Sequence, residues 1–77
     1  MEGEKELTYG GKAVGLTFNP GGDTEVTRVK EYFANVIDQL NDRKTPGQSE
    51  SNRLLSIAIT QAQDAQMWAV KAITWKD

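Results

Sequence analysis

The sequence predicts a mainly α-helical fold: an antiparallel two-helix hairpin with a short extended or β-hairpin N-terminal arm, assembled as a homo-oligomer. In two long segments, apolar residues recur every three or four positions, a spacing typical of amphipathic helices. The connection between them is short and contains Pro46 and Gly47, which makes the two helices antiparallel neighbours. The second segment is apolar on more than one side, so a chain of 77 residues needs another subunit to cover it.

The composition is that of one small domain, residues 1–77, which lacks the cross-links and metal sites that usually stabilise so short a chain. There are no cysteines and no histidines, which excludes disulfides and the usual zinc sites and leaves oligomerisation to stabilise a small core. Nine basic residues are outnumbered by eleven acidic ones, whereas proteins that hold DNA or RNA polymers present a basic face. We therefore expect no nucleic-acid polymer as a partner.

The N-terminal sequence is acidic where a signal peptide is basic and then apolar, and no apolar run is long enough to span a bilayer. We therefore expect a soluble intracellular protein that has no membrane partner.

Residues 1–22 form the predicted arm. The segments 7–9 and 12–18 are rich in β-branched and aromatic residues and flank the pair Gly10–Gly11, a pattern typical of a β-hairpin. An extended arm that lies on the helices is equally compatible with this pattern. Both alternatives end at the turn sequence Asn-Pro-Gly-Gly of residues 19–22.

The first helix is predicted over residues 24–41. Asp23 or Thr24 can accept hydrogen bonds from its free amides, and Glu25 is favourable in the first turn. Cations followed by Pro46 and Gly47 end it. Its apolar stripe follows steps of three and four and consists of Val26, Val29, Phe33, Val36 and Leu40, widened by Ile37.

The second helix is predicted over residues 49–75, with Ser49 or Ser51 as its cap. At about 1.5 Å per residue it is on the order of 37 Å long, against about 27 Å for the first helix. The arm or another subunit must cover the difference. A line of small side chains along this helix lets a second backbone approach closely, and it consists of Ala58, Ala62, Ala65, Ala69 and Ala72.

No catalytic group stands out. His and Cys are absent, and Asp64, the one carboxylate set among apolar positions of the second helix, is better placed to pair with a cation than to act as a general base. The run Gly10-Gly11-Lys12 lacks the spacing and the Ser or Thr of a phosphate loop. We expect no enzyme and no cofactor.

Two groups of polar residues are candidates for binding. Arg53, Ser56, Thr60 and Gln63 form a line on the second helix. The line is either a solvated face or, inside an oligomer, a set of donors for a ligand with several phosphates.

The second group lies near the start of the first helix. Arg28 and Lys30 follow the Asn-Pro-Gly-Gly turn, and a helix N-terminus with nearby cations can bind an anion. Tyr9 and Phe18, in the arm, can stack on a base. Alternatively, Phe18 anchors the arm to the core and Lys30 is exposed to solvent.

The runs 12–20 and 53–73 resemble the phage helical-hairpin proteins called anti-CBASS protein 2 and anti-Thoeris protein 1. The resemblance covers residues 7–75, and its most specific features are the spacing from Arg53 to Thr60 and the run from Met67 to Ala72. It implies a homo-oligomer, often a hexamer, that binds and sequesters cyclic nucleotide immune messengers without cleaving them. These messengers are cyclic dinucleotides, cyclic trinucleotides and cyclic ADP-ribose isomers. The resemblance also implies that the protein is located in the cytoplasm of the infected bacterial host.

By position, the resemblance assigns Lys30 to the phosphates of the ligand, and Phe18 and Asn19 to stacking on the base and hydrogen bonding to its edge. It assigns Arg53 and Thr60 to the phosphates of a trinucleotide near a symmetry axis.

One position departs from the family. Ile59 stands where the anti-CBASS branch often has an arginine, which argues against a complete trinucleotide site. The alternative function is a structural or adaptor hairpin whose polar lines only tune assembly and which has no small-molecule ligand.

Overall fold

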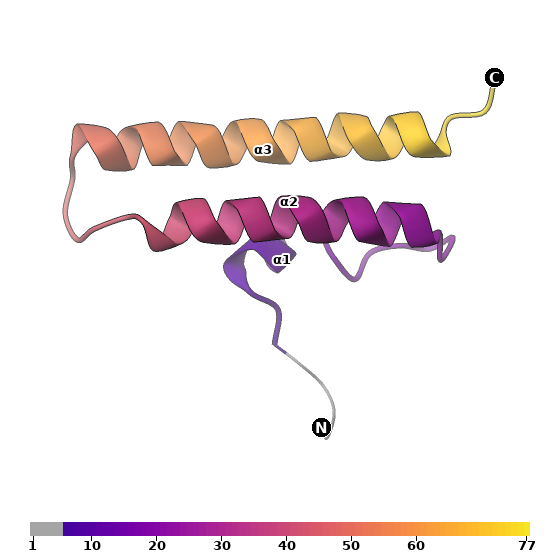
Figure 1. The fold of residues 1–77 in the computed structure, drawn as a ribbon, viewed down its shortest axis with the longest axis horizontal. Coiled ribbons are helices and arrows are strands. Elements are labelled where there is room, and N and C mark those ends of the chain that lie inside the picture. The colour runs from indigo at the N-terminus through magenta and orange to yellow at the C-terminus, as the bar shows by residue number, and fades with distance from the viewer. Residues whose placement is uncertain (1–5) are drawn as a thin grey trace.

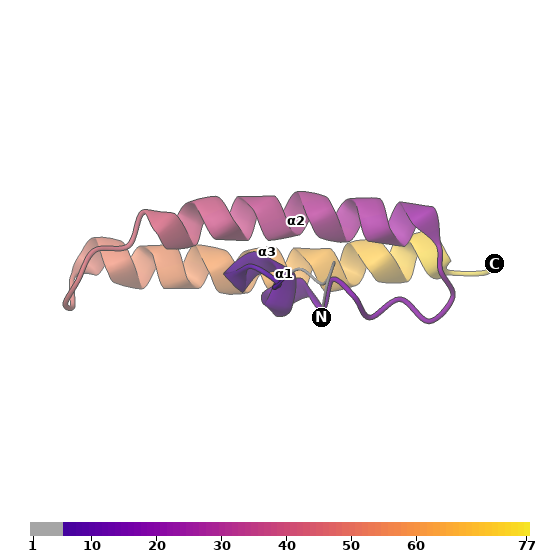
Figure 2. The same cartoon turned by 90° about the horizontal axis from the view of Figure 1, so that it is seen from below.

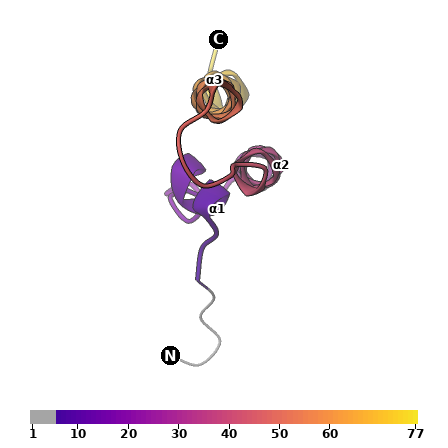
Figure 3. The same cartoon turned by 90° about the vertical axis from the view of Figure 1, so that its left-hand side faces the viewer.

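A computed structural model describes residues 6–77, and within them it contains three helices and no strand. They are α1 (Tyr9–Val14), α2 (Thr24–Asp42) and α3 (Glu50–Thr74). Figure 1 shows α2 and α3 side by side and antiparallel, and Figures 2 and 3 show α1 beside both of them. The predicted mainly helical hairpin is confirmed. The first five residues of the predicted arm lie outside the described residues.

The expectation of a β-hairpin or extended segment around Gly10–Gly11 is wrong, because the arm folds into α1. Thr8 caps this helix by accepting a hydrogen bond from the Gly11 amide at 3.0 Å. Gly15 ends it in the left-handed conformation (φ 63°), and the Leu16 amide donates back to the Gly11 carbonyl at 2.9 Å. This pair of features is a Schellman ending, for which glycine is the favoured residue.

Gly10 serves close packing between helices rather than a turn. A Cβ atom at this position would lie 2.1 Å from the carbonyl oxygen of Ala34 in α2. The Gly10 amide also donates to Oδ1 of Asp38 at 2.7 Å, which satisfies one of the free donors at the start of α1. Glycine therefore allows α1 to lie directly against the backbone of α2.

The two long helices begin at side-chain caps. Asp23 accepts from the Glu25 amide at 2.8 Å, and Ser49 accepts from the Asn52 amide at 3.1 Å. Of the alternatives left open by the sequence, Asp23 and Ser49 are thus the caps. In the connection, the Asn52 side chain donates to the carbonyls of Thr45 and Gly47 and accepts from the Thr45 amide, which fixes the path of this short loop.

The core is small and receives side chains from all three helices. Val14, Ala34, Ile37 and Ile59 form its buried cluster, and of residues 6–77 only Ile37 is fully buried. Phe33, Leu40 and Ala62 are among the partly buried residues that pack against this cluster. One member of the predicted stripe on α2 lies outside the core: Val36 is 47% exposed.

Many large apolar side chains remain exposed. They are concentrated on α3, and the set consists of Tyr9, Phe18, Tyr32, Val36, Leu54, Ile57, Met67, Trp68, Ile73 and Trp75. The end-on view of Figure 3 shows why: α3 meets α1 and α2 on one side, and no other described element covers its outer side. No helix in the described part of the chain combines the length and the apolar character needed to cross a bilayer.

Candidate functional site

A cavity of about 430 Å³ lies where the start of α2 meets the end of α3. We call it the end pocket. The antiparallel arrangement creates it, because it brings residues 18–21, which lead into α2, and the last turn of α3 to the same end of the hairpin. The end pocket brings together three of the predicted site residues, Phe18, Asn19 and Lys30. Its other wall consists of Val70, Ile73, Thr74, Trp75 and Lys76.

Lys30 is buried, with 6% of its surface exposed, although the sequence left open a solvent-exposed lysine. Its ammonium group donates to the carbonyl of Gly15 at 3.0 Å and to that of Phe18 at 2.5 Å. It also lies 5.6 Å from the centre of the Phe18 ring, within range of a cation–π interaction. Two of its three N–H donors are thereby used, which leaves one for a ligand in the end pocket.

Asn19 holds the turn onto α2. Its amide nitrogen donates to the Asp23 carbonyl at 2.9 Å and to the Thr27 hydroxyl at 2.8 Å. Since both N–H groups are used, only the side-chain carbonyl is left to accept a hydrogen bond from a ligand. Phe18, beside it, is 71% exposed and presents most of its ring to solvent. The exposed ring of Phe18 lies beside the carbonyl of Asn19 and the ammonium group of Lys30. This combination suits a ligand that contains a flat base and a phosphate.

Two residues that the sequence grouped with this site lie elsewhere. Arg28 is exposed and forms an ion pair with Glu25 at 3.7 Å, on a face of α2 different from that of Lys30. Tyr9 is 50% exposed at the start of α1 and does not line the end pocket. Of the two aromatic residues proposed to stack on a base, Phe18 is therefore the one at the pocket.

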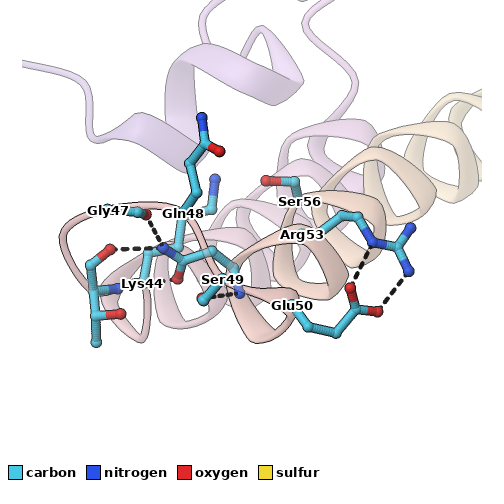
Figure 4. Close-up of a pocket in the computed structure, with 9 residues that line it drawn as sticks. Lys44, Gly47, Gln48, Ser49, Glu50, Arg53 and Ser56 are labelled. Atoms are coloured by element: carbon cyan, nitrogen blue, oxygen red, sulfur yellow. Dashed lines mark hydrogen bonds and ion pairs between the residues drawn. The ribbon is translucent and has the colours of Figure 1, made fainter.

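Arg53 and Ser56 lie at the opposite end of the hairpin, beside an open cavity of about 740 Å³ next to the α2–α3 connection. Arg53 is held by Glu50 through Nε–Oε1 (3.0 Å) and Nη2–Oε2 (2.6 Å). In Figure 4 these two side chains point toward each other and away from Gln48. Their hydrogen bonds lower the pKa of Glu50 and raise that of Arg53. A phosphate at Arg53 has to compete with this carboxylate.

The predicted polar line on α3 divides into two parts. Arg53, Ser56 and Thr60 are exposed, and Thr60 lines a separate hollow of about 300 Å³. Gln63 instead turns toward α1, where its amide nitrogen donates to the carbonyl of Ala13 at 3.3 Å. A single chain thus keeps these donors far from the end pocket, and only contacts between subunits can bring copies of Arg53 and Thr60 together.

Sequence reasoning missed the wall that α3 contributes to the end pocket. Trp75 and Lys76 follow the last turn of α3 and line the pocket opposite Phe18. The signal was present, because an antiparallel hairpin places the end of its second helix beside the start of its first. Lys71 lies close by, 5.2 Å from the Trp68 ring centre and 5.7 Å from that of Trp75.

Fold and pocket together define a small helical-hairpin protein whose pocket presents an ammonium group, an aromatic ring and an amide. Within residues 6–77 no cluster of acidic side chains is arranged to hold a metal ion. The family described as "Acb2/Tad1, hairpin domain" matches residues 11–74, and the chain belongs to it. This confirms the resemblance to the anti-CBASS 2 and anti-Thoeris 1 proteins. No curated protein and no solved structure matches the chain.

Proposed function

We propose that the chain is a phage anti-defence sponge: it binds cyclic nucleotide immune messengers in the host cytoplasm and sequesters them without cleaving them. The observation that carries the proposal is the end pocket in a member of the Acb2/Tad1 hairpin family. The pocket has the size of a small-molecule site and combines few polar groups with apolar walls.

The polar groups of the end pocket suit a nucleotide. The remaining N–H of Lys30 can donate to a phosphate oxygen, and Lys76 adds a second cation at the mouth. Phe18 and Trp75 supply rings on which a base can stack. The carbonyl of Asn19 can accept from the base edge. Every one of these contacts is non-covalent, as sequestration requires.

The sponge acts as a homo-oligomer, and we expect six copies by analogy with the family. The exposed side chains on the outer side of α3 support self-association, because Leu54, Ile57 and Trp68 are each more than 40% exposed in the single chain. In such an assembly, symmetry copies of Arg53, Ser56 and Thr60 meet as a second group of donors, whereas Arg28, paired with Glu25 on another face of α2, stays outside the end pocket.

A thermal shift series tests the proposal with cyclic dinucleotides, cyclic trinucleotides and cyclic ADP-ribose isomers. A ligand present at 100 times its dissociation constant stabilises the folded state by about 2.7 kcal/mol. For a domain of this size we expect a rise in melting temperature on the order of 10 °C or more. The nucleotide recovered after heat denaturation should be chemically intact, which distinguishes sequestration from hydrolysis.

Phe18→Ala and Tyr9→Ala are a matched pair for this experiment. Loss of base stacking at Phe18 costs about 1–3 kcal/mol, which is roughly a 5- to 150-fold loss of affinity. Tyr9→Ala removes a ring of similar size that is half exposed and lies outside the end pocket, so the affinity of this variant should equal that of the wild type. The structural or adaptor alternative predicts a well-folded oligomer with no shift for any messenger, and that result would reject the sponge.

A further inference from the structure

A second cavity, of about 530 Å³, lies between α1 and α3 on the other side of Phe18. We call it the amide pocket. It shares Phe18, Lys30 and Val70 with the end pocket, so these residues border both cavities. The part that is its own contains the side chains of Gln63 and Gln66.

Gln66 is the unusual residue in the amide pocket. It is 95% buried, with 5% of its surface exposed, yet its amide forms no hydrogen bond within residues 6–77. No fully buried side-chain nitrogen or oxygen of the described residues lacks a partner. The Gln66 amide therefore touches the solvent of the amide pocket. An amide that is almost enclosed and has no partner among the described residues can complete its hydrogen bonds with a ligand that enters the pocket.

Gln63 lies one turn before Gln66 on the same face of α3. Its amide nitrogen uses one N–H for the carbonyl of Ala13, which leaves its own carbonyl and a second N–H. Phe18, Met67 and Lys12 also line the cavity. The pocket thus offers neighbouring donors and acceptors, a stacking surface and a cation.

We propose that the amide pocket binds a second base of a cyclic dinucleotide or trinucleotide, next to the base in the end pocket, and that Gln66 determines the specificity for this second base by pairing with the donor–acceptor edge of adenine. A glutamine amide can donate to a ring nitrogen of adenine while accepting from its 6-amino group. The phosphate then lies near Lys30, at the boundary of the two pockets. This inference rests on the proposed function and adds to it a choice of base.

The test is calorimetric titration of the full chain with cyclic di-AMP, cyclic tri-AMP and cyclic di-GMP. We expect at least one adenine messenger to bind more tightly than cyclic di-GMP, and this comparison needs no variant. Gln66→Met keeps the side-chain shape but removes the amide, so adenine binding should fall roughly 5- to 150-fold. Binding of cyclic di-GMP should stay unchanged. Gln39→Met, the same change at an exposed position of α2, is the control and should bind like the wild type.

Two results overturn the inference while leaving the proposed function intact. One is a wild-type preference for cyclic di-GMP. The other is a Gln66→Met variant that binds the adenine messengers as tightly as the wild type. Failure of the wild-type protein to bind any cyclic nucleotide rejects the proposed function and this inference with it. The melting temperature and mass of the unliganded Gln66→Met oligomer, unchanged from wild type, separate a lost contact from a lost fold.

Discussion

Lys30 shows how one side chain can hold a loop and line a pocket at the same time. A buried ammonium group is costly unless it is hydrogen-bonded, and the carbonyls of Gly15 and Phe18 meet that requirement. The same bonds fix the loop that carries Phe18 and Asn19. The position of the aromatic ring in the end pocket therefore depends on a cation from α2, twelve residues further along the chain.

Gly10→Ala should detach α1 from α2. The added methyl group would lie 2.1 Å from the Ala34 carbonyl oxygen, and because that atom belongs to the backbone it cannot swing aside. We expect a loss of about 1–3 kcal/mol in the free energy of unfolding, measured by urea denaturation at fixed protein concentration.

Gly21→Ala is the matched control for this substitution. An added Cβ at Gly21 meets nothing within 4 Å, and its φ is not positive. Its stability should stay within about 0.5 kcal/mol of the wild type or rise slightly. Equal stabilities for the two variants would contradict the close contact between α1 and α2.

At the scale of whole elements, α3 is the least supported by its neighbours. It spans 25 residues against 19 for α2, so about 9 Å of it extends past its partner helix. Its start is held by the cap Ser49 and by Asn52, whose side chain closes the connection through hydrogen bonds to Thr45 and Gly47. The start of α3 therefore depends on its cap.

Ser49→Ala should fray this end of α3. Removal of the hydroxyl leaves the Asn52 amide without its acceptor, and the loss of such a cap costs about 1 kcal/mol. Ser51→Ala makes the same chemical change inside the exposed first turn, where alanine is the better helix former, and should be neutral or slightly stabilising. Amide hydrogen exchange of residues 50–54 should be faster in Ser49→Ala than in Ser51→Ala. Equal exchange rates in the two variants would show that Ser49 does not cap α3.

Elements with strong local signals could be predicted from the sequence, and elements fixed by packing could not. The helix expected over residues 24–41 spans Thr24–Asp42, because its stripe and its cap point to the same structure. The pair Gly10–Gly11 signals either a turn or a close helix contact, and only the backbone of Ala34 decides between them. Lys30 was predicted as a site residue, whereas its burial depends on carbonyls that no sequence pattern reveals. Gln66 gave no signal, since it resembles any polar residue on an amphipathic helix.

For the whole molecule, the distribution of apolar surface is the main feature still to be explained. Within residues 6–77, five apolar side chains are buried, whereas ten large ones are more than a third exposed. A core this small rarely stabilises a chain of this length, and the outer side of α3 offers the surface that another copy can cover. Burial of Ile57 and Trp68 between subunits would contribute roughly 1.5–3 kcal/mol for each side chain.

If the proposed oligomer forms through the outer side of α3, Ile57→Glu should break it, because the substitution places a carboxylate in that surface. The chain weighs 8.5 kDa, and light scattering after size exclusion should give a multiple of that mass for the wild type and about one copy for the variant. Asn35→Glu adds the same charge at an exposed position of α2 and should keep the wild-type mass. Since burial between subunits stabilises the fold, melting temperature should rise with protein concentration for the wild type and stay constant for Ile57→Glu. A wild-type mass of one copy would leave the exposed face of α3 without this explanation and remove the basis for a pocket shared between subunits.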